Sequence, residues 1–159
     1  MLFTSSYPLN IIITHYCDTS NLVKTLESIQ SQSFIHYRVQ IVDAGTTDLR
    51  NYISNFLDLP NIHLTVIPKI GIYEGMNFGI KTVPFGQMYQ IMNAGTTYNN
   101  SFALSRVLSE IKCISSIYVC AAKLDNFTSH PEAICSTNQM FPVNAFHESC
   151  IYPSLASIL

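Results

Sequence analysis

Charged side chains are scarce in this sequence: Asp, Glu, Lys and Arg make up 11% of its 159 residues, against about 25% in a typical domain. Eight Lys and Arg residues against ten Asp and Glu give a net charge of −2, so the chain lacks the basic excess of proteins that bind nucleic acids. Disordered chains combine low hydrophobicity with high net charge, and 48% of these residues are hydrophobic. The composition therefore predicts a folded domain that does not bind nucleic acid.

Long apolar runs are also missing. A membrane-spanning helix needs about 18 consecutive apolar residues, and every apolar run here is interrupted by Ser, Thr, Asn, His or a charged residue. The first eight residues lack the positive region and cleavage site of a signal peptide. The five cysteines form no Cys-x-x-Cys pair and no zinc spacing, so we expect reduced thiols. These absences predict no membrane span and a location in the cytoplasm or at the inner surface of the membrane.

Apolar, β-branched runs alternate with helical spacing over residues 9–122. This alternation predicts right-handed βαβ crossovers, and so an α/β fold whose doubly wound, mostly parallel sheet carries helices on both faces. From residue 123 the periodicity fails, and we expect one domain with an α/β core at 1–122 and an irregular segment at 123–159. We expect strands at 9–16, 37–42, 63–67, 87–92 and 117–122, and helices at 20–32, 47–57, 73–81 and 102–112.

Polar clusters follow three of the expected strands. They are Thr-His-Tyr-Cys-Asp at 14–18, Asp-Ala-Gly-Thr-Thr-Asp at 43–48 and Asn-Ala-Gly-Thr-Thr at 93–97. Ligands of open α/β sheets bind beyond the carboxyl ends of the strands, so we expect the three clusters to meet at one edge. Turns and helix caps use the same residue types. A dinucleotide site is excluded, because it needs Gly-x-Gly-x-x-Gly after the first strand and residues 14–20 contain no Gly.

Four ordered segments carry a resemblance to a known family. Residues 11–32 contain Ile-Ile-Ile-Thr-His-Tyr and then Leu-Glu-Ser-Ile-Gln-Ser-Gln, 41–48 read Ile-Val-Asp-Ala-Gly-Thr-Thr-Asp, 71–80 read Gly-Ile-Tyr-Glu-Gly-Met-Asn-Phe-Gly-Ile, and 146–149 read Phe-His-Glu-Ser. Together they resemble the family 2 glycosyltransferases of GT-A fold, inverting enzymes of bacterial polysaccharide synthesis. The resemblance implies transfer of a sugar from a nucleotide-diphosphate sugar to a glycan or lipid-linked acceptor.

The resemblance also implies roles for individual residues. Thr14 and Asp43 would line the nucleotide pocket, with the Asp43 carboxylate accepting hydrogen bonds from the base. Asp48 would cap the following helix and shape the pocket wall. Asn77 would hold the sugar-phosphate region, with Glu74 nearby.

At two places the sequence departs from the family. Residues 91–95, Ile-Met-Asn-Ala-Gly, lie where the related subgroup has Leu-Asn-Ala-Gly-Asp, its version of the DxD motif that binds Mg²⁺ or Mn²⁺ through carboxylate oxygen. Asn93 and Gly95 match, but Thr96 stands where the subgroup has its metal-binding Asp. Lys69 and Ile70 replace an Asp-Lys pair, and Lys69 would either contribute charge to a phosphate or be a solvated loop lysine.

A catalytic base has no clear candidate. Inverting transfer needs a base within hydrogen-bond reach of the attacking hydroxyl, and the family's base lies downstream of the segment that 146–149 resemble. We therefore expect the usual carboxyl-terminal acceptor part to be lacking, with His147 and Glu148 as the remaining candidates. Two hypotheses stay open, an active transferase and a catalytically impaired accessory or interaction protein. The apolar stretch at 150–159 further predicts a homodimer or a partner protein that covers it.

Overall fold

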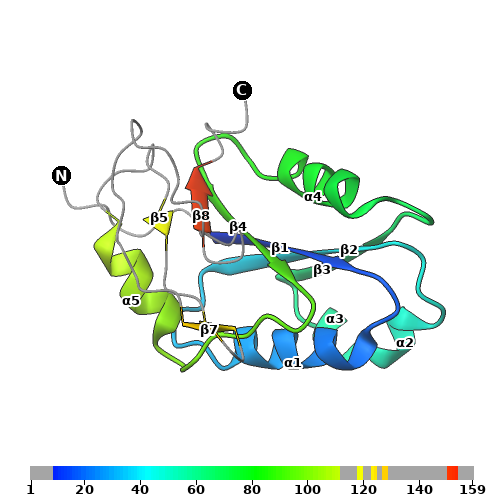
Figure 1. Cartoon of the computed structure of the whole chain (residues 1–159), viewed down its shortest axis with the longest axis horizontal. Coiled ribbons are helices and arrows are strands. Elements are labelled where there is room, and N and C mark those ends of the chain that lie inside the picture. Colours follow the sequence, from blue (N-terminus) through cyan, green and yellow to red (C-terminus); the bar gives the residue numbers. More distant parts are fainter. Residues whose placement is uncertain (1–8, 112–117, 120–122, 125–126, 129–149, 154–159) are drawn as a thin grey trace.

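The computed structural model describes residues 9–111, 118–119, 123–124, 127–128 and 150–153. Strands and helices alternate along most of this part of the chain (Figure 1). The elements are β1 (Leu9–His15), α1 (Thr19–Gln30), β2 (Tyr37–Asp43), α2 (Leu49–Tyr52), α3 (Ser54–Leu57), β3 (Ile62–Val66), α4 (Ile72–Lys81), β4 (Met88–Asn93), α5 (Ala103–Glu110), β5 (Tyr118–Val119), β6 (Lys123–Leu124), β7 (Phe127–Thr128) and β8 (Cys150–Pro153). Of the helices in these ranges, none is long and apolar enough to cross a bilayer.

The main sheet has the strand order β3-β2-β1-β4-β8-β5. Strands β3, β2, β1 and β4 run parallel, and β8 pairs antiparallel with both β4 and β5. The predicted α/β fold with a mostly parallel sheet is therefore confirmed. In the register of the sheet, Thr14 lies opposite both Val42 and Asn93, so these residues stand level at the carboxyl edge.

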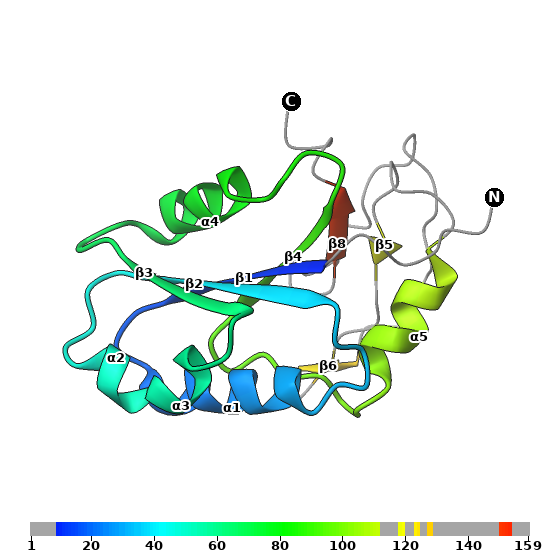
Figure 2. The same cartoon turned by 180° about the vertical axis from the view of Figure 1, so that it is seen from behind.

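Helices cover both faces of the sheet, with α1, α2 and α3 on one face and α4 on the other (Figures 1 and 2). The strand order explains this arrangement. From β1 to β3 the chain moves in one direction across the sheet, and from β3 to β4 it returns past β1. Right-handed crossovers in opposite directions place their helices on opposite faces. The reversal puts the topological switch point between β1 and β4, where α/β proteins bind ligands.

The hydrophobic core has two parts because β1 is buried on both faces. Ile11 and Ile13 belong to a cluster with the apolar face of α1, and Ile12 belongs to a second cluster under α4. Helix α4 lies unusually close to β1 at Gly79, where a Cβ atom would collide with Cγ2 of Ile12. Only glycine permits this approach, so Gly79, in the last turn of α4, has a packing role.

Two expectations about elements are wrong. The single helix expected at 47–57 is two short helices, α2 and α3, because Ile53 between them has a non-helical backbone (φ −110°, ψ 18°) and a fully buried side chain. Packing of this side chain in the core overrides the helical spacing of its neighbours. The irregular segment expected from residue 123 includes strand β8, which joins the main sheet. A four-residue strand ending in proline has too few residues to show a period, and its place is fixed by pairing with β4 and β5.

Candidate functional site at the switch point

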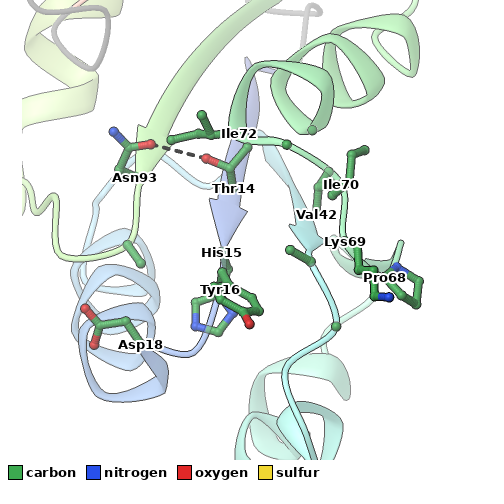
Figure 3. Close-up of a pocket in the computed structure, with 15 residues that line it drawn as sticks. Thr14, His15, Tyr16, Asp18, Val42, Pro68, Lys69, Ile70, Ile72 and Asn93 are labelled. Atoms are coloured by element: carbon green, nitrogen blue, oxygen red, sulfur yellow. Dashed lines mark hydrogen bonds between the residues drawn. The ribbon is translucent and has the colours of Figure 1, made fainter.

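An open cleft of about 710 Å³ lies at the carboxyl edge of the parallel strands. Its volume falls in the range of about 300–1,000 Å³ that is usual for small-molecule sites. Four chain segments form it: the end of β1 with the residues after it, the end of β2, the loop into α4 with the start of that helix, and the end of β4 (Figure 3). The lining residues are Thr14, His15, Tyr16, Asp18, Val42, Ala44, Gly45, Pro68, Lys69, Ile70, Gly71, Ile72, Gly75, Asn93 and Ala94.

The three polar clusters of the sequence meet at this cleft, each contributing lining residues. At the switch point the Thr14 hydroxyl donates a hydrogen bond to Oδ1 of Asn93, at 3.2 Å, which links the ends of β1 and β4 (Figure 3). Helix α4 also comes close here, since a Cβ on Gly75 would lie 3.3 Å from Cγ2 of Thr14. Of the residues given a nucleotide-binding role from the sequence, Thr14 is the one that lines the cleft.

Asp43 lies behind the cleft rather than in its lining, and its side chain is fully buried. Oδ1 accepts hydrogen bonds from Nδ1 of His15 (2.8 Å) and the Thr46 hydroxyl (2.7 Å). Oδ2 accepts from the backbone N–H groups of Gly45 (3.0 Å) and Thr46 (2.7 Å). These four bonds use the acceptor positions of a carboxylate. In this geometry Asp43 holds the turn after β2, and its contact with a base stays a prediction.

The hydrogen bonds also keep Asp43 ionised. Burial pushes the pKa of the Asp43 carboxyl upward, but the bonds from Thr46, His15 and Gly45 outweigh burial and leave the pKa below its ordinary value. Because an ionised carboxylate only accepts, Nδ1 of His15 carries the proton in their contact. His15 is buried as well, and its Nε2 has no hydrogen-bond partner in the described part of the chain.

The structure adds Tyr16 and Asp18 to the site, whereas the resemblance assigned a role only to Thr14 in their cluster. The Tyr16 side chain is 66% exposed, so its ring is available at the wall of the cleft. The Asp18 carboxylate is the N-cap of α1 and accepts from Nδ2 of Asn21 at 2.8 Å. That bond, more than any other contact, lowers the pKa of Asp18. Their position directly after β1 was the signal that could have identified both.

Other predicted site residues lie away from the lining. Asp48 is the N-cap residue of α2, but its carboxylate makes no capping bond, and its carbonyl accepts from the Asn51 N–H at 2.9 Å. Glu74 accepts from the Gly71 N–H at 2.9 Å at the start of α4, and Asn77 is exposed on the same helix. The roles of Asp48, Glu74 and Asn77 at a nucleotide sugar remain predictions. The candidate bases, His147 and Glu148, lie outside the described residues.

The segment after β4 forms a turn against α1. The Gly95 N–H donates to the Thr25 hydroxyl (2.9 Å), and the Thr96 N–H donates to the Asn93 carbonyl (3.0 Å). The side chains that this segment could offer to a metal ion, those of Asn93 and Thr96, are neutral, whereas Mg²⁺ and Mn²⁺ prefer carboxylate oxygen. Among the described residues no three His, Cys, Asp or Glu side chains are grouped to hold a metal ion. The residues at this end of β4 therefore do not fit the cation that the resemblance implies.

No family model and no curated protein sequence matches the chain. Solved structures do match: S. aureus TarS in complex with UDP is 16% identical with a TM-score of 0.72, and 92% of this chain aligns with 47% of that one. TarS has also been solved in complex with UDP-GlcNAc, with a TM-score of 0.69. The mannosyltransferase PcManGT from Pyrobaculum calidifontis, in complex with GDP-Man and Mn²⁺, is also 16% identical, with a TM-score of 0.63 over 76% of this chain and 37% of its own. The chain thus spans about half the length of the TarS structure, and it has the GT-A fold of glycosyltransferases.

Proposed function

We propose that this chain binds a nucleotide-diphosphate sugar in the switch-point cleft and transfers the sugar to a glycan or lipid-linked acceptor. The observation that carries the proposal is the cleft itself. It lies at the position where α/β sheets bind ligands, it has the volume of a small-molecule site, and the clusters after β1, β2 and β4 line it. The likeness of the fold to TarS and PcManGT supports a nucleotide sugar as the ligand.

Within the cleft, the residues after β1 suit the nucleoside. The exposed ring of Tyr16 offers an aromatic face, and stacking on such a face contributes about 1–3 kcal/mol per base. Thr14 and Asn93 place a hydroxyl and an amide side by side in the lining of the cleft, where they suit sugar or phosphate oxygens.

The proposal is tested by titration calorimetry with UDP, GDP and dTDP, comparing Tyr16→Ala with Tyr73→Ala. Both rings are highly exposed, at 66% and 75%, so neither change removes a core contact, but only Tyr16 lines the cleft. Tyr16→Ala should weaken binding about tenfold through lost stacking, and Tyr73→Ala should leave it unchanged. Absence of binding by the folded protein to all three nucleotides would overturn the proposal.

A second candidate function is nucleotide-sugar binding without transfer, as an accessory protein. The shortage of acidic residues in the cleft favours this role. Asp18 is the one Asp or Glu in the lining of the described part, and its carboxylate is held by Asn21 as a helix cap. A base for the attacking hydroxyl would then have to come from elsewhere.

Release of the nucleoside diphosphate separates the two candidates. The protein is incubated with the sugar form of whichever nucleotide binds, with and without a panel of glycan and lipid-linked acceptors. Release that depends on an acceptor supports the transferase. Tight binding without release across the panel supports the accessory role.

A further inference from the structure

We propose that Lys69 holds the diphosphate of the bound nucleotide and that this binding needs no divalent metal ion. The inference rests on the proposed function and adds to it the cation that neutralises the diphosphate. It starts from the mismatch between the neutral donor set after β4 and the carboxylate ligands of Mg²⁺ or Mn²⁺.

Three acidic groups in or beside the cleft are engaged in structural hydrogen bonds. Asp43 accepts four bonds in the turn after β2. Asp18 caps α1 through Asn21. Glu74 accepts from the Gly71 N–H and so occupies the amino-terminal end of α4. Of these three carboxylates, Asp18 alone is in the lining of the described part of the cleft.

Lys69 is the one Lys or Arg among the described residues that line the cleft, and its side chain is exposed. Within the described part it makes no ion pair, since the single pair found there joins His15 and Asp43. An ammonium group with three donors and no acidic partner among the described residues suits a phosphate group, which a lysine binds as a point charge.

The backbone at Lys69 is held in an uncommon conformation. Its φ is +64°, in the left-handed region that non-glycine residues seldom adopt and that costs about 1–2 kcal/mol. The Lys69 N–H donates to the Ala44 carbonyl at 2.9 Å, and the preceding Pro68 packs against Gly45, where a Cβ would lie 3.3 Å from Cα of Pro68. These contacts with the end of β2 fix the loop, so Lys69 is presented at the cleft from a rigid and strained position.

The charge and the metal are tested together by measuring, in EDTA and in Mn²⁺, the dissociation constants of UDP, GDP and dTDP and of the monophosphate of whichever binds. The variants are Lys69→Gln, Lys69→Arg and, as a matched control, Lys81→Gln. Lys81 is in the last turn of α4, at the other end of that helix from the cleft. Tyr16→Ala serves as a variant that weakens the binding of both the diphosphate and the monophosphate.

We expect EDTA to change the affinity for UDP or GDP less than about twofold. Lys69→Gln should weaken binding of the diphosphate about tenfold or more, as loss of a charged hydrogen bond does. It should weaken binding of the monophosphate much less. Lys69→Arg should retain most of the affinity, and Lys81→Gln should match the unmodified protein.

Two results would overturn the inference alone: binding that disappears in EDTA and returns with Mn²⁺, or binding that Lys69→Gln leaves unchanged. If the unmodified protein binds none of the three diphosphates under either condition, the proposed function fails, and the inference fails with it. The two failures are therefore distinguishable.

Discussion

At the scale of single residues, Asp43 is the buried charge on which the carboxyl edge of the sheet depends. The sequence showed an acidic residue at a strand end, but its four hydrogen bonds follow from the fold of the turn at 43–46 and from His15, 28 residues away. A residue type and a position were therefore predictable, whereas the occupation of every acceptor position was not.

Replacing Asp43 should destabilise the protein in a pH-dependent way. Asp43→Asn replaces one carboxylate oxygen by an NH₂ group, so two of the four donors lose their acceptor. The free energy of unfolding should fall by about 3 kcal/mol at pH 7, as it does on loss of one partner of a buried pair. The pKa of Asp43 is lowered in the folded state. Its contribution to stability is thus fully present above the unfolded value of about 3.9 and is lost as the pH falls through the lower folded value.

Urea denaturation from pH 7 down to pH 2 measures this effect, with Asp58→Asn as a control at an exposed carboxylate. The gap between the unmodified protein and Asp43→Asn should narrow below pH 4. A gap that is absent at pH 7, or that stays constant down to pH 2, would contradict the hydrogen bonding described for Asp43.

Replacing Lys69 by glycine should stabilise the protein, whereas replacing Asp43 should destabilise it. Lys69→Gly relieves the left-handed backbone and should raise the free energy of unfolding by about 1 kcal/mol, or the melting temperature by about 2–4 °C. Lys69→Ala removes the same charge but keeps the strain, so it should not be stabilised. Calorimetric melting of the two variants measures the difference, and equal melting temperatures would show that the position is unstrained.

At the scale of elements, the spacing of hydrophobic residues predicted secondary structure correctly wherever an element is long and amphipathic. Strands β1, β2 and β4 and helices α1 and α4 lie where the pattern predicts them. The pattern failed at Ile53, where burial of one side chain divides a helix, and at β8, whose place depends on strands distant in sequence. Short elements fixed by tertiary contacts leave no periodic signal.

Helix α4 supplies the prediction at this scale. Gly79→Ala should destabilise the protein by about 1–3 kcal/mol, because the new methyl would collide with Ile12 and force the helix off β1. In an exposed helix the same change would stabilise by about 1 kcal/mol, so the sign is diagnostic. Chemical denaturation measures it, with Asn77→Ala as the exposed control on the same helix.

A double variant checks the cause. Ile12→Ala removes the colliding atoms, so Gly79→Ala should cost less in that background than alone. If Gly79→Ala destabilises the protein equally in both backgrounds, contact with Ile12 is not the cause of its effect.

At the scale of the whole molecule, the sequence predicted the class of fold and the edge of the sheet that carries the site, because both follow from the order of strands and helices. The same order did not reveal the hydrogen bonds that engage Asp43, Asp18 and Glu74, since these depend on turns and caps. The roles of the DxD-equivalent segment and of Asp43 were inferred from the resemblance, and the structure gives the hydrogen bonds around both.

The homodimer or partner protein predicted from the apolar stretch at 150–159 concerns the whole molecule too. Cys150–Pro153 form β8 within the main sheet, and Ile151 is buried there by the chain itself. Light scattering over a wide range of concentrations tests the prediction. A mass above that of one chain supports it, and a mass of 17.8 kDa throughout would contradict it.

The central claim is that a nucleoside diphosphate binds in the switch-point cleft, and a crystal structure of the protein with UDP or GDP in EDTA tests it most directly. The account predicts density for the nucleotide between residues 14–18 and 68–72, with the base against Tyr16 and the diphosphate within hydrogen-bond distance of Lys69. Density elsewhere on the molecule, or an empty cleft at saturating nucleotide, would contradict it.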